Sequence, residues 1–226
     1  MKLGVVLPTF RWTMEEALAK AAACAAAGID GVFAYDHLFP MNAPERPAFA
    51  PFALLARVAH LHPSLMVGPL VARVGMVSPS QLAGEFWTLD MVAPGRVIAG
   101  IGTGDALSAK ENAAWGLPVA SADDRRAAIR EVTQHLPDGM PLWIGGGAPA
   151  TVALARDLGA ELNLWNATPQ DVAQAASDGP VNFAGPVPED LGGTLDALES
   201  AGATWAICAP NVDIEALSSW RREKTL

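Results

Sequence analysis

Short apolar runs alternate with helical segments along the whole chain, and this alternation constrains the fold more than any other feature. Such runs, bounded by glycine, proline or polar residues, are typical of strands buried on both faces of a parallel sheet. We expect strands at residues 3–7, 31–35, 65–71, 97–101, 142–144, 162–165, 181–184 and 205–209, with helices at 14–27, 52–60, 78–92, 123–135, 150–158, 169–176, 191–201 and 214–222.

Eight strand–helix units without a change of composition predict an α/β protein with one closed (β/α)8 barrel, a TIM barrel, over residues 1–226 as a single domain. The chain is a little shorter than the roughly 250 residues typical of that fold. The alternative is an open, doubly wound sheet. In the barrel, the carboxyl ends of the strands gather on one face, and the chemistry is expected there.

Bulk properties exclude several classes of protein. The formal net charge of −9 argues against nucleic acid as a partner, because such binding requires a basic surface. No apolar run reaches the roughly 18 residues of a membrane span, and no basic-then-apolar leader opens the chain. Cys24 and Cys208 lie far apart in apolar surroundings, which predicts free buried thiols. We therefore expect a soluble cytoplasmic protein.

Glycine clusters follow two of the predicted strands. Residues 97–101 lead into Gly102, Thr103, Gly104 and Asp105, and the run at 142–144 leads into three glycines. Glycines without a Cβ allow backbone amides to contact an anion or a flat ring. The strand ends hold few reactive side chains, with neither a nucleophile elbow nor metal-ligand spacing. This combination favours a site in which a cofactor supplies the chemistry.

Three motifs in order carry a family resemblance: Asp36-His37 after the second strand, SPSQLAGEFWTLDMVAPGRVIAGIGTGDAL at 78–107 and PLWIGGG at 141–147. With them, the chain resembles the luciferase-like monooxygenase superfamily, in the branch of coenzyme F420-dependent oxidoreductases. The resemblance implies a barrel of the bacterial luciferase-like type. It also implies hydride transfer between bound F420, a deazaflavin, and a small organic substrate.

The resemblance assigns roles to residues of the first half. His37 would lie beside the redox ring as an acid, base or hydrogen-bond partner, and Asp36 would orient it. A structural histidine that caps the next helix is the alternative. Leu70-Val71 would form a bulge behind the ring, often with a cis peptide, rather than an ordinary strand. Asp105 stands where a sugar-phosphate dehydrogenase of the family has a proton-donating glutamate, although a solvated acid that opens a helix is equally expected.

Two loops complete the expected cofactor site. Gly102, Thr103 and Gly104 would line the pocket wall, and Gly145, Gly146, Gly147 and Ala148 would hold the cofactor phosphate at a helix N-terminus. Arg11 and Arg73 are the nearest cations for an anionic group, although solvated surface residues are the favoured interpretation.

The sequence is also compatible with two other functions: an FMN-dependent monooxygenase with a separate reductase, and a non-enzymatic flavin-binding relative. A homodimer is expected, because the family commonly dimerises and the chain is 51% hydrophobic.

Overall fold

The computed structural model describes residues 1–40, 43–104, 108–117 and 120–225. Within these residues, nine parallel strands form one sheet in the order β3-β2-β1-β9-β8-β7-β6-β5-β4. The strands are β1 (Lys2–Val6), β2 (Gly31–Ala34), β3 (Met66–Pro69), β4 (Ala72–Arg73), β5 (Ala99–Gly102), β6 (Leu142–Gly145), β7 (Glu161–Trp165), β8 (Val181–Gly185) and β9 (Trp205–Cys208).

The sheet closes on itself through the two ends of its strand order. β3 and β4 follow one another in the chain and are separated only by Leu70 and Val71. β3 pairs with β2, while β4 pairs with β5, and a parallel bridge from Val67 to Val97 joins β3 to the segment before β5. β3 and β4 are therefore two halves of one strand. The expected (β/α)8 barrel is confirmed, and the alternative of an open sheet is excluded.

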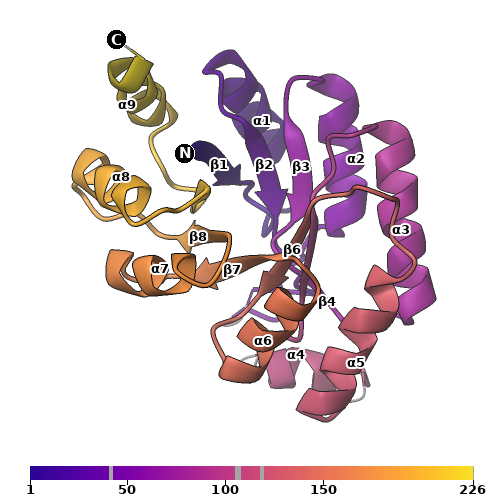
Figure 1. Cartoon of the computed structure of the whole chain (residues 1–226). Helices are drawn as coiled ribbons and strands as arrows, with labels where there is room; N and C mark the ends of the chain where they lie inside the picture. Colours follow the sequence, from indigo (N-terminus) through magenta and orange to yellow (C-terminus); the bar gives the residue numbers. More distant parts are fainter. Residues whose placement is uncertain (41–42, 105–107, 118–119, 226) are drawn as a thin grey trace.

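Helices surround the strands on the outside of the barrel (Figure 1). Local signals explain their ends: Ser78 caps α3 by accepting a hydrogen bond from the Gln81 amide, and Pro79 occupies the first turn. The helices of the described ranges are α1 (Glu15–Ala26), α2 (Pro51–Leu61), α3 (Pro79–Val92), α4 (Ala109–Ala114), α5 (Ala122–Thr133), α6 (Pro149–Asp157), α7 (Pro169–Ala176), α8 (Leu191–Ser200) and α9 (Ile214–Thr225). The short helix α4 was not among those expected from the sequence.

The apolar core has two layers. The larger lies between the sheet and the helices. The smaller fills the barrel, where Phe33 of β2, Trp143 of β6 and Trp205 of β9 meet with ring centroids 5.1–5.7 Å apart. Gly4 makes room for this cluster, because a Cβ there would lie 2.7 Å from the Phe33 ring. The barrel is therefore packed with side chains below its open carboxyl end.

Both cysteines are buried and free, as expected, and burial raises the pKa of each thiol to about 12. They are therefore protonated at neutral pH and act as small apolar side chains. None of the helices in the described segments is long and apolar enough to cross a membrane.

Candidate active site

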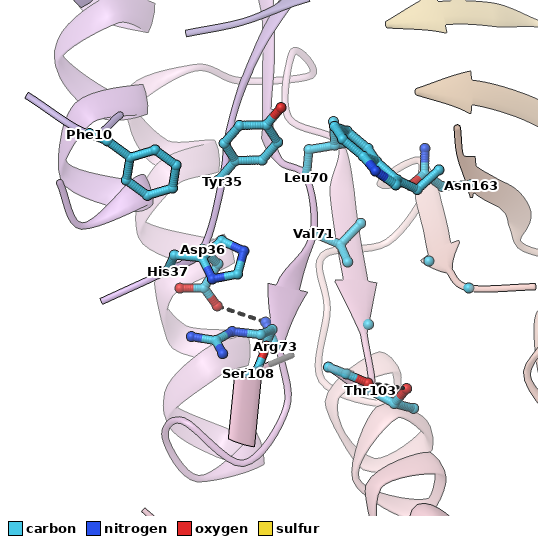
Figure 2. A pocket seen from close by; sticks show the side chains of 15 residues that line it. Phe10, Tyr35, Asp36, His37, Leu70, Val71, Arg73, Thr103, Ser108 and Asn163 are labelled. Carbon is cyan, nitrogen blue, oxygen red and sulfur yellow. Dashed lines mark hydrogen bonds between the residues drawn. The ribbon is translucent and has the colours of Figure 1, made fainter. Parts of the chain in front are cut away.

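A cavity of about 450 Å³ opens at the carboxyl ends of the strands (Figure 2). Its wall is mainly apolar, and it brings together segments from across the barrel. The lining residues are Phe10, Tyr35, Asp36, His37, Leu70, Val71, Arg73, Gly102, Thr103, Gly104, Ser108, Gly145, Gly146, Asn163 and Trp165. Most of the residues expected at the site thus share one pocket.

The break between β3 and β4 forms one wall of this cavity. The Leu70–Val71 peptide bond is cis, as the family resemblance implied, and both side chains line the pocket. Figure 2 shows Val71 between the His37 side and the Asn163 side of the cavity. The bulge therefore offers an apolar surface to whatever occupies the pocket.

The neighbouring glycines make room for the bulge. A Cβ at Gly100 would lie 2.2 Å from the Pro69 carbonyl oxygen. A Cβ at Gly102 or Gly145 would lie 2.5 Å or 2.8 Å from Val71 Cγ2. Real Cβ atoms do not approach other atoms so closely. Gly102 and Gly145 line the pocket, and their closeness to Val71 was not expected from the sequence.

A buried carboxylate, Glu111 of α4, organises the opposite wall. Its two oxygens accept hydrogen bonds from both terminal nitrogens of Arg73, at 3.0 and 3.2 Å. The same carboxylate accepts a bond from His37 Nδ1 at 2.9 Å and one from the Leu38 amide. Glu111 is only 4% exposed and Arg73 only 6%. The expectation that Arg73 is a solvated surface residue was wrong, because Glu111 compensates its charge inside the protein.

The carboxylate that holds His37 is therefore Glu111, and the expected orienting role of Asp36 was wrong. Asp36 Oδ2 instead accepts a hydrogen bond of 2.7 Å from the Arg73 backbone amide (Figure 2). No local signal marked Glu111, which lies 74 residues from His37 in the sequence. Only the folded chain brings the two side chains together.

The two carboxyl groups have opposite pKa shifts. Burial raises the pKa of Asp36 above its ordinary value, despite the hydrogen bond and charge of Arg73. Burial also acts to raise the pKa of Glu111, but bonds from His37 and Leu38 and the charge of Arg73 outweigh it, so its pKa lies below the ordinary value. Glu111 is thus a carboxylate that can only accept hydrogen bonds. His37 Nδ1 must then carry the hydrogen, and Nε2 is left for the pocket.

Aromatic side chains form the outer part of the cavity. Tyr35 stacks on Phe10 with centroids 6.0 Å apart, and it meets Trp165 edge-on at 5.7 Å. Burial raises the pKa of Tyr35 to about 12, so its hydroxyl keeps its proton at neutral pH. Trp165 is 52% exposed and lies at the mouth. These three residues were not predicted as site residues.

The remaining expected residues divide between the pocket and its surroundings. Thr103, Gly104 and Gly146 line the cavity. Gly147 and Ala148 lie beyond the lining, exposed before the N-terminus of α6. Arg11 lies on the surface, where it pairs with Glu16 at 2.6 Å. Asp105 lies outside the described residues.

The N-terminus of α6 differs from those of the next three helices. At the starts of α7, α8 and α9, the carboxylates of Asp171, Asp190 and Asp213, respectively, accept hydrogen bonds from backbone amides. No side chain caps α6, whose N-cap is Ala148 with Pro149 next. Amides at a helix N-terminus carry partial positive charge and suit an anion.

Across the described residues, no cluster of three or more His, Cys, Asp and Glu side chains could hold a metal ion.

Known relatives resemble about half of the chain. An F420-dependent glucose-6-phosphate dehydrogenase of Intrasporangium calvum is 36% identical over 107 residues, 46% of this chain and 31% of the relative. An F420-dependent hydroxymycolic acid dehydrogenase of Mycobacterium tuberculosis is 33% identical over 107 residues, 47% of this chain and 30% of the relative. The matched stretches thus span about a third of these proteins.

A solved structure matches the whole barrel. An F420-dependent secondary alcohol dehydrogenase, in complex with an F420-acetone adduct, superposes with a TM-score of 0.79 at 14% identity. The match covers 96% of this chain and 97% of the other, and at this identity it establishes the fold alone. The luciferase-like monooxygenase family model matches residues 1–136. Because that match spans more than half of the 226 residues, the chain belongs to the luciferase-like monooxygenase family.

Proposed function

We propose that this protein is an oxidoreductase that transfers a hydride between coenzyme F420 and a small organic substrate. The observation that carries this proposal is the pairing, across one cavity, of the apolar Leu70–Val71 bulge with the hydrogen-bonded His37 ring. Leu70 and Val71 would offer apolar contact to a planar ring, and His37 would contact the substrate. When bound, F420 supplies a ring carbon that accepts or donates the hydride.

The residues present fit such a cofactor. A cavity of about 450 Å³ is within the range of small-molecule sites and has a mainly apolar wall. The uncapped N-terminus of α6 lies just beyond Gly145 and Gly146 of the lining, where backbone amides can hold the phosphate. Both relatives described above are named as F420-dependent enzymes, which supports the same cofactor here.

His37 moves the proton in this proposal. With Nδ1 fixed on Glu111, the free Nε2 takes the hydroxyl proton of an alcohol as the hydride leaves the adjacent carbon. In the reverse direction, Nε2 gives the proton to the carbonyl oxygen. Glu111 keeps the ring oriented through its hydrogen bond to Nδ1. Atoms and charge balance, because one proton and one hydride leave or enter the substrate together.

The charges in the pocket favour an uncharged substrate. Arg73 is the one cation among the described lining residues, and both its terminal nitrogens bind Glu111. Asp36 adds a second acidic group, so the described part of the wall offers no excess positive charge to a substrate phosphate. Phe10, Tyr35 and Trp165 instead offer apolar and aromatic contacts. We therefore propose an apolar alcohol or carbonyl compound rather than a sugar phosphate.

Binding titrations with F420 and with FMN, followed by stopped-flow hydride transfer, test the function. F420 should bind more tightly than FMN, and an apolar secondary alcohol should reduce it while glucose 6-phosphate does not. His37→Ala should leave the F420 affinity nearly unchanged and slow hydride transfer by about 100-fold. Parental rates in His37→Ala would make the histidine structural. Tight FMN binding with weak F420 binding would favour a monooxygenase, and binding without turnover of any substrate would favour a binding protein.

The same proposal includes a cytoplasmic homodimer. Trp87, Met91 and Val92 of α3 and Leu61 of the adjacent α2 are between 40% and 78% exposed. Apolar side chains gathered on neighbouring helices are typical of a surface that pairs with a second copy. Light scattering should give twice the monomer mass at micromolar concentration, and Met91→Glu should shift the protein toward the monomer. A monomeric parent would refute this part of the proposal.

A further inference from the structure

A chain of polar side chains runs through the apolar barrel and ends at the pocket. Glu161 and Asn163 lie two residues apart on β7, so their side chains share one face of the strand. Asn182 of β8 is paired with Asn163. Asn163 Nδ2 donates to Asn182 Oδ1 at 2.5 Å, and Asn182 Nδ2 donates to Glu161 Oε1 at 2.8 Å. Asn163 is 5% exposed and Asn182 fully buried. Glu161 forms the end of the chain away from the cavity, and Asn163 lines the cavity itself.

The carboxylate end sets the direction of every hydrogen bond in this chain. Trp143 Nε1 donates to Glu161 Oε2 at 3.1 Å, and the Thr204 hydroxyl donates to Oε1. A carboxylate that receives these donors can only accept a bond from Asn182. Asn182 must then present its amide nitrogen to Glu161 and its oxygen to Asn163. Asn163 must in turn use its own amide nitrogen for Asn182.

This direction leaves one atom of Asn163 for the pocket. Turning the Asn163 amide by 180° would bring its oxygen against Asn182 Oδ1 and break that bond. If Asn182 turned as well, its bond to Glu161 would be lost. Within the described parts of the chain, no residue donates to Asn163 Oδ1. Asn163 lies on the other side of the cavity from His37, beyond Leu70 and Val71 (Figure 2). A fixed acceptor therefore faces the space beside the bulge.

We propose that Asn163 is a specificity-determining residue whose Oδ1, locked by Asn182 and Glu161, accepts a hydrogen bond from a ring N–H of the bound cofactor. This inference rests on the proposed function. Oxidised deazaflavin and flavin rings both carry an N–H at ring N3, between two carbonyl groups. A ligand without this N–H leaves a buried acceptor unpaired, which is the arrangement that gives strong discrimination.

Fluorescence titration compares binding of F420 with binding of F420 methylated at ring N3. The parent protein should bind F420 at least about tenfold more tightly than the methylated form. Asn163→Ala should reduce this ratio to less than about threefold, since it removes the acceptor and makes space for the methyl group. Thr204→Val is the matched control, because it deletes a hydroxyl at the far end of the chain and keeps the carboxylate. It should retain the parental ratio.

Thermal melts establish that each variant is folded, and Asn163→Ser, whose hydroxyl can still donate toward Asn182, replaces Asn163→Ala if alanine prevents folding. The inference is overturned if the parent binds both ligands within about threefold, or if Asn163→Ala keeps the parental ratio. Either result would leave F420 binding intact. Failure of this inference is therefore distinguishable from failure of the proposed function, which would appear as weak binding of F420 itself.

Discussion

The two sides of the pocket are built in different ways. On the His37 side, three charged or titratable side chains from β4, α4 and the end of β2 hold one another through Glu111. On the other side, β5 and β6 contribute glycine backbone that leaves room for Val71. The first side depends on the balance of buried charge, and the second depends on the absence of side-chain volume. Removal of a charge should therefore destabilise the His37 side, and added side-chain volume should destabilise the glycine side.

Removal of the buried carboxylate should have the largest effect on stability. Glu111→Ala leaves the Arg73 guanidinium buried without its counter-charge, and we expect the free energy of unfolding to fall by about 3–5 kcal/mol. Denaturant titration measures this loss. The control is Asp157→Ala, which breaks the exposed pair with Arg130 and should change the stability by less than about 1 kcal/mol. Similar losses in the two variants would contradict a buried charge network.

Added volume on the glycine side should have the next largest effect. Gly100→Ala places a methyl group against the Pro69 carbonyl, and overpacking of this kind destabilises proteins by about 1–3 kcal/mol. Gly84→Ala on α3 is the matched control, because nothing lies within 4 Å of its Cβ. There the helix propensity of alanine should stabilise the protein by up to about 1 kcal/mol. If Gly100→Ala is neutral, the close packing of β5 against the bulge is wrong.

A substitution outside the lining separates cofactor binding from packing. A Cβ at Gly147 lies 3.8 Å from Leu164, an ordinary contact, so the fold should tolerate Gly147→Val. The valine should block amides before α6 and weaken F420 binding by about tenfold, since charge-assisted hydrogen bonds are lost. The ring fragment of F420 without its phosphate should bind parent and variant equally. Unchanged F420 affinity in Gly147→Val would refute the phosphate assignment.

These differences explain what could be predicted from the sequence. The barrel and most pocket residues follow from apolar runs and from the loops at their ends, which are local signals. The cis bond at Leu70–Val71 was expected only from the family resemblance, because Gly68 and Pro69 disturb the run at 65–71 but do not specify which bond bends the strand. Gly102 and Gly145 can be read from the sequence, but their packing against Val71 depends on how β4, β5 and β6 lie together in the barrel.

The charged side of the pocket could not be predicted, for a different reason. Glu111 lies on a six-residue helix with weak periodicity, far in sequence from His37 and Arg73. Its neighbour in the sequence, Lys110, makes the segment read as a solvated surface. Asn163 carried a weak signal, a polar residue inside an apolar strand. Its meaning depended on Glu161 and Asn182, which only the barrel brings into line.

The smallest expected effect is on the pH dependence of stability, to which Glu111 and Asp36 on the His37 side contribute in opposite directions. The folded-state pKa of Glu111 is lowered, so its contribution to stability is present above its ordinary value of 4.5 and is lost as the pH falls below it. The folded-state pKa of Asp36 is raised above 3.8, so its burial lowers stability at neutral pH and this penalty is relieved as the pH falls.

The two isosteric amides should therefore change the acid limb of the stability curve in opposite directions. Glu111→Gln should lose less stability than the parent between pH 5 and pH 3 relative to its own value at pH 7, whereas Asp36→Asn should lose more. Asparagine can still accept the Arg73 amide bond, which isolates the effect of charge. Urea titrations at closely spaced pH values measure both slopes. Parallel slopes in the two variants would mean that the carboxyl groups share one environment, and that Glu111 alone does not carry the charge balance of the pocket.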